Sequence, residues 1–475
     1  MILSTNTKHW LIEQAAFQKS RTAVKTSAGE FSFSKLIDFS LRASNFLKEN
    51  KIKKNNKVAI LTNNSIEFIV TINALWFIGA IPVLINYKAT ESEISEQTDY
   101  LNIKYLISFN STNNIEIANI KKINFTLITL AKYTNQFVPL PFLLRNKAAI
   151  MYTSGSTNKP KCVEFTFKNL FESVRQMDKV VNQTIYDTWL ALLPFYHIGG
   201  FSIIIRSLIT GTKIIIPKTS KIEDIITEVR LNHPSLISVV PILFKKILNN
   251  IEKPWKKLRV VFVGGAPIQK RLIHKALKNY WPIYVVYGST ETASMITMCS
   301  PENIIKNGLS AGRPFEGVEV TINDKNGLVT ITSNSVANAY ILSNGKRKSL
   351  ASTFNSNDLG KIDQNNNLHI LGRNDDIIIS GGRNISLKEI EEKLLKKFKR
   401  IKLIGVKDLK WEQSYIIVTD LKEEKIKEEL NYFIRKNFSG YKQPQNIFIV
   451  DKIPYNEMGK LNKELLKEII NVDFL

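Results

Sequence analysis

The sequence contains few cysteines and no N-terminal export signal. Its 475 residues include 2 cysteines, Cys162 and Cys299, which lie far apart in the chain. Two cysteines without a metal-ligand spacing indicate neither a disulfide framework nor a zinc site. The N-terminus lacks a basic segment followed by an apolar core and a cleavage site. We therefore expect a protein of the reducing cytoplasm rather than a secreted one.

Long uninterrupted apolar runs are also scarce. The one stretch that approaches membrane length, residues 68–85, contains Asn73, Gly79 and Pro82. A Gly-Ala-Ile-Pro break divides it into a helical part and a strand part, which predicts a buried helix-turn-strand unit. We expect no stable insertion into a membrane.

Acidic residues are fewer than basic ones. The chain has 42 Asp and Glu against 66 Lys and Arg, which gives a formal net charge of +24. A basic nucleic-acid-binding protein is the alternative from a different class, and salt-sensitive DNA binding would reveal it. The lysines, however, are spread through the whole chain and accompany abundant Asn and Ile, as in a general compositional bias. We expect no nucleic-acid partner.

The length and the hydrophobic pattern indicate a globular protein with more than one domain. A hydrophobic content of 44% over this length predicts two or three folded domains. Short β-branched runs alternate with longer amphipathic stretches, which predicts α/β layers with largely parallel sheets. The runs are residues 57–61, 80–86, 105–108, 213–217, 236–239, 260–263 and 283–287.

The sequence pattern changes after about residue 310. Turn-rich segments at 323–327 and 365–367 separate short strands, which predicts a more antiparallel region. From residue 385 onward a helix, two strands, a helix and a strand predict a compact α+β domain. The expected fold is thus α/β: two layered α/β subdomains and a β-rich subdomain in a large N-terminal region, then a small mobile α+β C-terminal domain.

One segment, MYTSGSTNKPKCVE at residues 151–164, has the composition of a polyphosphate cradle. Its glycine and hydroxyl residues let the backbone turn and aim N–H groups at one point, while Lys159 and Lys161 add positive charge. Pro160, and not glycine, precedes Lys161, so the segment is not the common G-x-x-x-x-G-K-[ST] nucleotide loop. On its own, such a segment is equally typical of an ordinary connector.

Further segments carry groups suited to phosphate chemistry. VYGSTETAS at 286–294 places Tyr287, Thr290 and Glu291 at a strand end. A tyrosine ring can stack on a purine, a hydroxyl can bond a phosphate oxygen, and a carboxylate can hold Mg²⁺. The segment 354–360 offers Asp358, whose two acceptor oxygens suit a ribose diol.

Three other segments supply cations and a turn histidine. Residues 371–386 contain Arg373 and a Gly381-Gly382 turn, and residues 453–464 carry Lys460 on a glycine-flanked loop. A lysine on such a loop can bring a single point charge into a site. Residues 189–211 place His197 at a turn before an apolar helix.

These six segments, in this order and at these intervals, resemble the adenylate-forming superfamily, which includes acyl-CoA synthetases, peptide-synthetase adenylation domains and beetle luciferases. The resemblance spans almost the entire chain. It implies that a carboxylate attacks the α-phosphorus of ATP to give an acyl-adenylate and pyrophosphate, and that a thiol, usually of coenzyme A, then displaces AMP. The implied cofactors are ATP and Mg²⁺, with coenzyme A as co-substrate, and catalysis should be mainly positional and electrostatic.

The resemblance also implies a role for each motif residue. Glu291 would hold the magnesium ion and Thr290 would contact the α-phosphate. The positions implied for the β- and γ-phosphates are Thr153, Ser154, Ser156, Thr157 and Lys161. The adenine would be framed by Gly265, Ala266 and Tyr287, and the ribose fixed by Asp358 and Arg373.

The resemblance implies that different C-terminal residues act in the two half-reactions. Lys460 would bridge the reacting carboxylate and the α-phosphate. Asp375 matches the hinge about which the small domain rotates, so that a face bearing Gly381 and Gly382 replaces Lys460 and admits the pantetheine arm. The implied domains are residues 1–374, for adenylation, and residues 375–475, which carry the catalytic lysine.

Within the superfamily, LPFYHIGGFSIIIRSLITG resembles the corresponding segment of the o-succinylbenzoate:CoA ligases of menaquinone biosynthesis. The shared feature is a basic residue nine positions after His197, here Arg206. A guanidinium in an apolar helix needs an anionic partner or a route to water. The resemblance implies an aromatic dicarboxylate substrate, bound near His197, whose ring carboxylate pairs with Arg206.

Several alternatives remain open at this point. Another acyl- or aryl-CoA ligase, or an adenylation enzyme that loads a carrier protein, would carry the same motifs. Arg206 is also typical of a snorkelling surface residue or of half an internal ion pair. Glu291 and Asp358 could cap helices, and Lys460 could be a solvated charge. Assembly into a homo-oligomer is left open.

Some positions depart from the superfamily pattern. Asn158 and Cys162 replace glycines of the phosphate loop, and Ser356-Asn357 replaces the Thr-Gly before the ribose aspartate. Arg383 and Glu412 are further departures within the C-terminal domain, so they bear more on thioester formation than on adenylation.

Overall fold

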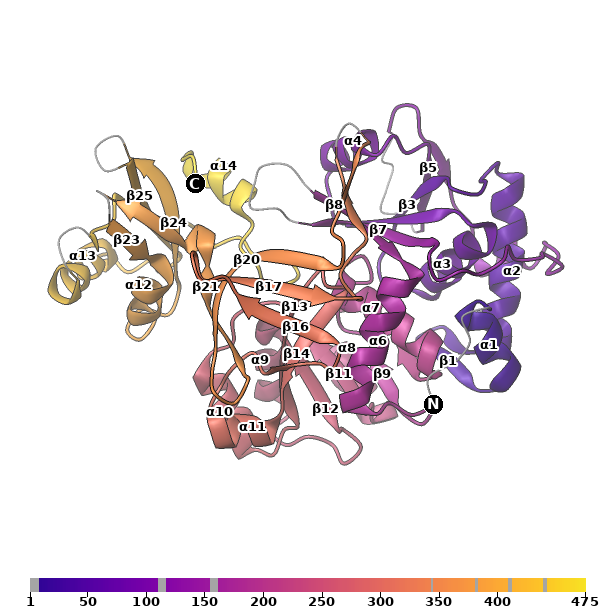
Figure 1. The fold of residues 1–475 in the computed structure, drawn as a ribbon, viewed down its shortest axis with the longest axis horizontal. Coiled ribbons are helices and arrows are strands. Elements are labelled where there is room, and N and C mark those ends of the chain that lie inside the picture. Colours follow the sequence, from indigo (N-terminus) through magenta and orange to yellow (C-terminus); the bar gives the residue numbers. More distant parts are fainter. Residues whose placement is uncertain are drawn as a thin grey trace. The chain divides into compact units, whose positions relative to one another are not determined.

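The computed structural model describes residues 8–109, 117–153, 161–342, 345–380, 383–408, 412–438 and 442–475 (Figure 1). They form two compact units. The first consists of Met1–Val320, Ile331–Phe354 and Gln364–Leu368, and the second of Thr321–Thr330, Asn355–Asp363 and His369–Leu475. Two segments before residue 364 thus belong with the C-terminal part. The division between residues 374 and 375 stays a prediction.

The first unit contains an eight-stranded mixed sheet in the order β19-β18-β8-β7-β4-β3-β5-β6. Pairing is parallel from β6 to β7 and antiparallel from β7 to β19. The strands are β3 (Lys57–Leu61), β4 (Ile81–Ile85), β5 (Tyr105–Ser108), β6 (Lys121–Ile123), β7 (Lys147–Thr153), β8 (Lys161–Thr166), β18 (Ala339–Ile341) and β19 (Arg347–Ser349).

Helices from residues 10–130 accompany the strands of this sheet. They are α1 (Trp10–Phe17), α2 (Phe33–Glu49), α3 (Ile66–Ile78), α4 (Glu91–Tyr100) and the short α5 (Leu127–Leu130). Helix α3 is buried along almost its whole length, because it is apolar on every side. It ends at Ile78, with Gly79 as its left-handed C-cap shortly before β4. The predicted helix-turn-strand unit is therefore confirmed. None of the helices described is long and apolar enough to cross a membrane.

A nine-stranded sheet, β15-β14-β13-β12-β11-β9-β10-β1-β2, forms the rest of the first unit. Its strands are β1 (Thr22–Thr26), β2 (Gly29–Ser32), β9 (Thr188–Leu190), β10 (Lys213–Ile215), β11 (Leu236–Val239), β12 (Val260–Val263), β13 (Ile283–Ser289), β14 (Ser294–Cys299) and β15 (Arg313–Pro314). The six strands from β1 to β13 in this order are parallel, so their carboxyl ends share one edge. Parallel sheets commonly place ligands at that edge.

Helices between these strands supply the core. They are α6 (Phe167–Val181), α7 (Ile198–Thr210), α8 (Ile222–Asn232), α9 (Pro241–Asn250), α10 (Lys270–Lys278) and α11 (Pro301–Asn307). Phe244 of α9 and Trp281 before β13 are fully buried among the strand residues Ile237 and Val261. Helices α6 and α7 lie side by side (Figure 1).

A four-stranded sheet has the order β16-β17-β20-β21, with β16 (Val318–Ile322), β17 (Leu328–Ser333), β20 (Thr353–Ile362) and β21 (Leu368–Arg373). The turn η1 (Asn374–Asp376) follows. A five-stranded sheet then contains β22 (Ile377–Ser380), β23 (Arg383–Ser386), β24 (Ile401–Asp408), β25 (Glu412–Thr419) and β26 (Asn446–Ile449), with helices α12 (Leu387–Leu394), α13 (Ile426–Asn437) and α14 (Lys463–Ile470).

Both faces of the five-stranded sheet are covered. Leu403 and Ile417 pack with α12 and α13 on one face, whereas Ile404 and Ile416 pack with Leu466 of α14 on the other. This alternation follows from the two-residue period of strand side chains. The predicted α/β class and compact α+β C-terminal body are confirmed; helix α14 was not among the predicted elements.

Candidate active site

The turn between β13 and β14 presents Thr290 and Glu291. Thr292 holds this turn, because its Oγ1 accepts a hydrogen bond from Ser289 N at 2.9 Å. Gly288 is required beside it: a Cβ there would lie 1.9 Å from the carbonyl oxygen of Ser294. Glu291 lies in a turn between strands and does not cap a helix, so the capping alternative is wrong.

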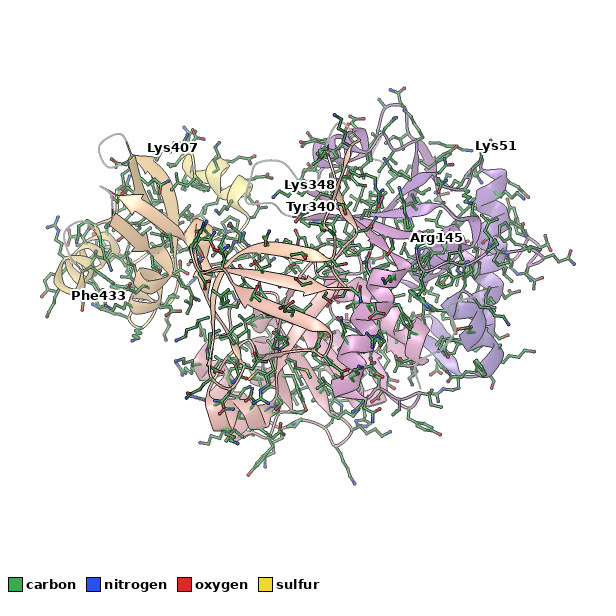
Figure 2. All side chains as sticks on the ribbon, viewed as in Figure 1. Lys51, Arg145, Tyr340, Lys348, Lys407 and Phe433 are labelled. Carbon is green, nitrogen blue, oxygen red and sulfur yellow. The ribbon has the colours of Figure 1, made fainter. Side chains whose placement is uncertain are left out.

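Tyr340 of β18 links Glu291 to the phosphate-loop strand. Its Oη donates to Glu291 Oε1 at 2.9 Å, and Lys161 Nζ lies 5.8 Å from the centroid of its ring. Burial and the negative charge of Glu291 raise the pKa of Tyr340, so the phenol remains a donor. Tyr340 and its register partner Lys348 lie side by side on β18 and β19 (Figure 2). A carboxylate and a cation from two sheets therefore meet at one tyrosine.

The ends of the phosphate segment are paired. Thr153 at the end of β7 and Lys161 at the start of β8 are register partners, and Thr153 Oγ1 donates to the carbonyl of Lys161 at 3.4 Å. Residues 154–160, which include Ser154, Ser156 and Thr157, lie outside the described residues. Burial raises the pKa of Cys162 to about 12, so this thiol is a packing group and not a thiolate nucleophile.

Gly265 and Ala266 lie close to Tyr287. They follow β12, whose Val263 pairs with Val285 of β13, so the turn after β12 lies beside the end of β13. A Cβ on Gly264 would lie 2.8 Å from the carbonyl oxygen of Val286, which shows how closely the two backbones approach. The structure thus brings all three residues predicted to frame the adenine to the carboxyl edge of the nine-stranded sheet.

Arg206 of α7 is buried with only 1% of its surface exposed. Its Nη2 donates to Ser294 Oγ at 3.5 Å, and its Cζ lies 5.2 Å from the centroid of the Trp189 ring. Its Nε and Nη1 have no hydrogen-bond partner among the described residues. Arg206 is therefore neither a snorkelling surface residue nor part of an ion pair within the described ranges. Burial lowers the pKa of Arg206 to about 9, so the guanidinium stays charged at neutral pH.

Among the residues that the structure describes, no carboxylate forms an ion pair with Arg206. The indole Nε1 of Trp189 is a second buried donor without a described partner, and the Trp189 ring stacks on Phe262 with centroids 5.5 Å apart. Ser294 is held at φ 96°, an unusual backbone conformation for a residue with a side chain. Unpaired buried donors of this kind are costly in an empty site and suit an anionic ligand.

His197 occupies the N-cap position of α7, as predicted. Its ring lies 4.3 Å from that of Tyr196, measured between centroids, and its side chain makes no capping hydrogen bond. His197 and Arg206 thus come from the two ends of one apolar helix, with the histidine only partly buried.

Asp358 and Arg373 come together in the second unit. They lie on β20 and β21, which are neighbours in one sheet, and Arg373 Nη1 is 4.0 Å from Asp358 Oδ1. Ser356 Oγ accepts a hydrogen bond from Asp358 N at 3.1 Å, so the serine that departs from the superfamily pattern still orders this segment. Asp358 is in a strand, and the helix-cap alternative is wrong for it as well.

Lys460 lies exposed on a tight loop before α14. Asn456 organises the loop, because its Oδ1 accepts from Met458 N at 3.0 Å and from Lys460 N at 2.9 Å. The carbonyl of Lys460 accepts in turn from Asn456 N at 2.8 Å. Asn456 thus fixes the backbone at Lys460.

The remaining predicted residues are only partly described. Asp375 belongs to η1, directly after β21, and only its backbone is described. Gly381 and Gly382 lie outside the described residues, although the flanking Ser380 and Arg383 are antiparallel register partners. The hinge and thiol-channel roles stay predictions.

Reasoning from the sequence missed three residues of this site: Tyr340, Trp189 and Ser294. Tyr340 lies outside every motif, and its hydrogen bond to Glu291 joins elements of two different sheets. Trp189 and Ser294 stand at the ends of recognised motifs, yet no pattern marks them as neighbours of Arg206.

The donor set suits a magnesium ion that is shared with phosphate. No group of three or more His, Cys, Asp or Glu side chains that could hold a metal occurs within the described residues. Mg²⁺ is usually bound by one or two carboxylates together with water and phosphate oxygens. A single carboxylate such as Glu291, beside Lys161, fits that mode.

The family model for the AMP-binding enzyme matches residues 11–341. Among curated proteins, the 2-succinylbenzoate–CoA ligase of Bacillus pumilus is 29% identical, with 97% of each chain covered. The enzyme of the same name from Bacillus velezensis is 28% identical, with 98% of each chain covered.

Solved structures show the same similarity. The o-succinylbenzoate CoA synthetase of Bacillus subtilis in complex with its acyl-adenylate intermediate has a TM-score of 0.88 at 26% identity, covering 98% of this chain and 99% of that one. The complex of the Bacillus subtilis enzyme with ATP and magnesium has a TM-score of 0.86 at 26% identity, covering 97% and 99%.

Proposed function

Because this chain belongs to the AMP-binding enzyme family, we propose that it is an AMP-forming ligase that joins o-succinylbenzoate to coenzyme A. The succinyl carboxylate oxygen attacks the α-phosphorus of ATP, and pyrophosphate leaves. The thiol sulfur of coenzyme A then attacks the acyl carbonyl carbon of the adenylate, its proton is lost, and AMP leaves. The products are o-succinylbenzoyl-CoA, AMP and pyrophosphate. The reaction is a step of menaquinone biosynthesis.

The observation that carries the substrate assignment is the buried guanidinium of Arg206, whose Nε and Nη1 have no hydrogen-bond partner among the described residues. O-succinylbenzoate has two carboxylates, of which one reacts and the other, on the aromatic ring, can accept hydrogen bonds from Nε and Nη1. Trp189 beside the guanidinium offers an aromatic face and a further N–H donor. A monocarboxylic fatty acid would leave all these donors unsatisfied. The names of the curated relatives support the same substrate.

In this proposal, catalysis of the adenylation step is mainly electrostatic. Thr290 donates to the α-phosphate, and Lys161 with Thr153, Ser154, Ser156 and Thr157 binds the β- and γ-phosphates. Glu291 would hold Mg²⁺, which would neutralise charge on the phosphate oxygens. Tyr340 orients Glu291 through its 2.9 Å hydrogen bond. Such preorganised groups lower the barrier where charge develops on the phosphate oxygens.

The nucleoside is bound by the residues at the sheet edge and in the second unit. Gly265, Ala266 and Tyr287 frame the adenine, while Asp358 accepts hydrogen bonds from the ribose hydroxyls beside Arg373. Lys460 stabilises the charge shared by the carboxylate and the α-phosphate. Rotation about Asp375 then exchanges Lys460 for the Gly381-Gly382 face and admits the thiol.

We further propose that the enzyme acts in the cytoplasm, where ATP and coenzyme A are available, without a nucleic-acid partner. A homo-oligomer is compatible with the proposal. Size-exclusion chromatography with light scattering would measure its assembly state.

The substrate proposal predicts a specific preference. In the presence of ATP, Mg²⁺ and coenzyme A, kcat/KM for AMP release should be about 100-fold higher with o-succinylbenzoate than with 4-oxo-4-phenylbutanoate. The second acid lacks only the ring carboxylate. The measurement is AMP release over a panel that also includes benzoate and a medium-chain fatty acid. Equal rates with both keto acids, or a faster rate with the fatty acid, would favour the alternative of a different acyl- or aryl-CoA ligase.

The position of Tyr340 predicts a smaller effect. Tyr340→Phe removes the hydrogen bond to Glu291 but keeps the ring near Lys161, so the Mg²⁺ concentration that gives half-maximal adenylation should rise about threefold to tenfold. Tyr100→Phe, whose hydroxyl donates to the carbonyl of Ile341 and does not contact Glu291, is the matched control. A Mg²⁺ dependence unchanged by Tyr340→Phe would contradict the role of Glu291 as metal ligand.

A further inference from the structure

A cavity of about 340 Å³ lies in the first unit, away from the residues described above. Three basic side chains line it, Arg21, Lys213 and Lys257, together with the hydroxyl groups of Thr22, Thr188 and Ser235. No carboxylate is among its lining residues. Its volume is that of a pocket for a small molecule.

The cavity is at the amino ends of the parallel strands. Thr22, Thr188 and Lys213 are the first residues of β1, β9 and β10, and Ser235 directly precedes β11. Gly265 and Tyr287 lie at the opposite, carboxyl edge of the same sheet. A four-residue strand alone spans roughly 13 Å, so one small ligand cannot occupy both places.

The carboxylates around the cavity are already paired. Glu30 of β2 accepts a hydrogen bond from Thr22 and lies 3.1 Å from Lys25 Nζ. Asp187 makes a two-point contact with Arg259, with both distances 2.7 Å, and also accepts from Ser235 Oγ at 2.6 Å. The three lining cations have no ion-pair partner within the described residues.

Positive charge consequently accumulates at Lys213. This lysine is half-buried, and its pKa is lowered by burial and by the positive charges of Lys25, Arg21 and Lys257, although Glu30 acts in the opposite direction. Arg21 is held in place, because its Nη2 donates to the carbonyl of Ile185 and its guanidinium lies 5.5 Å from the centroid of the Tyr186 ring. A fixed guanidinium loses little entropy when it binds an oxyanion.

We propose that this cavity is a second ligand site, which binds a small phosphate-bearing anion, either inorganic phosphate or a small phosphorylated metabolite. The three cations and the hydroxyl of Thr188 are donors, and no carboxylate is among the residues that line the cavity. Phosphate oxygens accept from both kinds of group. The planar guanidinium of Arg21 suits two-point contact with such an anion. Binding here would relieve the repulsion between Lys213 and its neighbours.

The test uses inorganic phosphate as the probe and a pair of adjacent lysines as variants. Lys257 lines the cavity, whereas its neighbour Lys256 is also exposed but is not among the lining residues. Phosphate binding to the full-length protein is measured by isothermal titration calorimetry at constant ionic strength, so that general screening cancels. Lys257→Gln should weaken the tightest phosphate site about tenfold, the effect of losing one charge-assisted hydrogen bond. Lys256→Gln should change it less than twofold.

A crystal soaked with phosphate should show the anion against Arg21, Lys213 and Lys257. Equal phosphate affinity of the wild type and both variants, or no saturable phosphate binding, would overturn the proposal. Lys460→Ala should leave this affinity unchanged, so that failure here is distinguishable from failure of the proposed ligase activity. A phosphorylated metabolite that binds tighter than phosphate and loses affinity with Lys257→Gln would identify which source occupies the site.

Discussion

Replacing Arg206 by methionine is expected to lower kcat/KM for o-succinylbenzoate about 100-fold or more, because the ring carboxylate would lose a buried charged partner. The same variant should use 4-oxo-4-phenylbutanoate at least as well as the wild type does, since that acid offers no anion to Arg206. The preference between the two acids therefore collapses. Initial-rate measurements of AMP release with both acids test this directly.

The stability of the Arg206→Met variant separates a substrate role from a structural one. Arg206 is 1% exposed, and two of its nitrogens have no partner among the described residues. Methionine removes an uncompensated buried charge, so the free energy of unfolding without substrate should rise by about 1 kcal/mol or more. Denaturant titration measures it. If the variant were destabilised by several kcal/mol and lost activity equally with both acids, Arg206 would be a structural residue and the substrate assignment would be wrong.

Lys460→Ala is expected to slow acyl-adenylate formation about 100-fold or more, which is the usual cost of removing a charge that stabilises the transition state. Conversion of a supplied acyl-adenylate and coenzyme A to the thioester should remain within about threefold of the wild-type rate. Pyrophosphate release and thioester formation are followed separately. Equal loss of both half-reactions would refute the division of labour between Lys460 and the Gly381-Gly382 face.

The local structure makes Lys460→Ala a clean test. Asn456 holds the loop through the backbone N–H and carbonyl of Lys460, and alanine keeps both of these groups. The unfolding free energy should change by less than about 0.5 kcal/mol, as for other exposed side chains. Lys463→Ala, three residues further on and also exposed, is the matched control and should retain normal adenylation.

Much of the secondary structure could be predicted from the sequence. The runs at residues 57–61, 105–108, 236–239 and 260–263 coincide with β3, β5, β11 and β12, because strands buried on both faces read as continuous β-branched segments. Helix α3 was predicted as the helical part of the apolar stretch at residues 68–85, before the Gly-Ala-Ile-Pro break. Helix α14 was not predicted, because several of its apolar side chains are exposed and its lysines resemble those of a solvated tail.

The candidate site was predictable only where a motif carries it. Glu291, Asp358 and Arg373 could be found, since each belongs to a segment of recognisable composition and order. Tyr340 could not, because its contact with Glu291 joins residues 49 positions apart that belong to elements of two different sheets. The basic cavity could not be predicted either. In the sequence, Arg21, Lys213 and Lys257 do not stand out from the other basic residues of a lysine-rich chain. They come together only because the amino ends of the parallel strands lie at one edge of the sheet.

The sequence by itself determined the α/β class, the ordered motifs and thereby the resemblance to adenylate-forming enzymes, which the match to the AMP-binding enzyme family confirms. These follow from local periodicity and composition, which need no long-range contact. The tertiary structure decided the state of Arg206. Whether a guanidinium in an apolar helix reaches water, meets a carboxylate or stays buried and unpaired depends on what Trp189 and Ser294 bring to it from distant strands. Burial and hydrogen bonding are properties of the assembled fold.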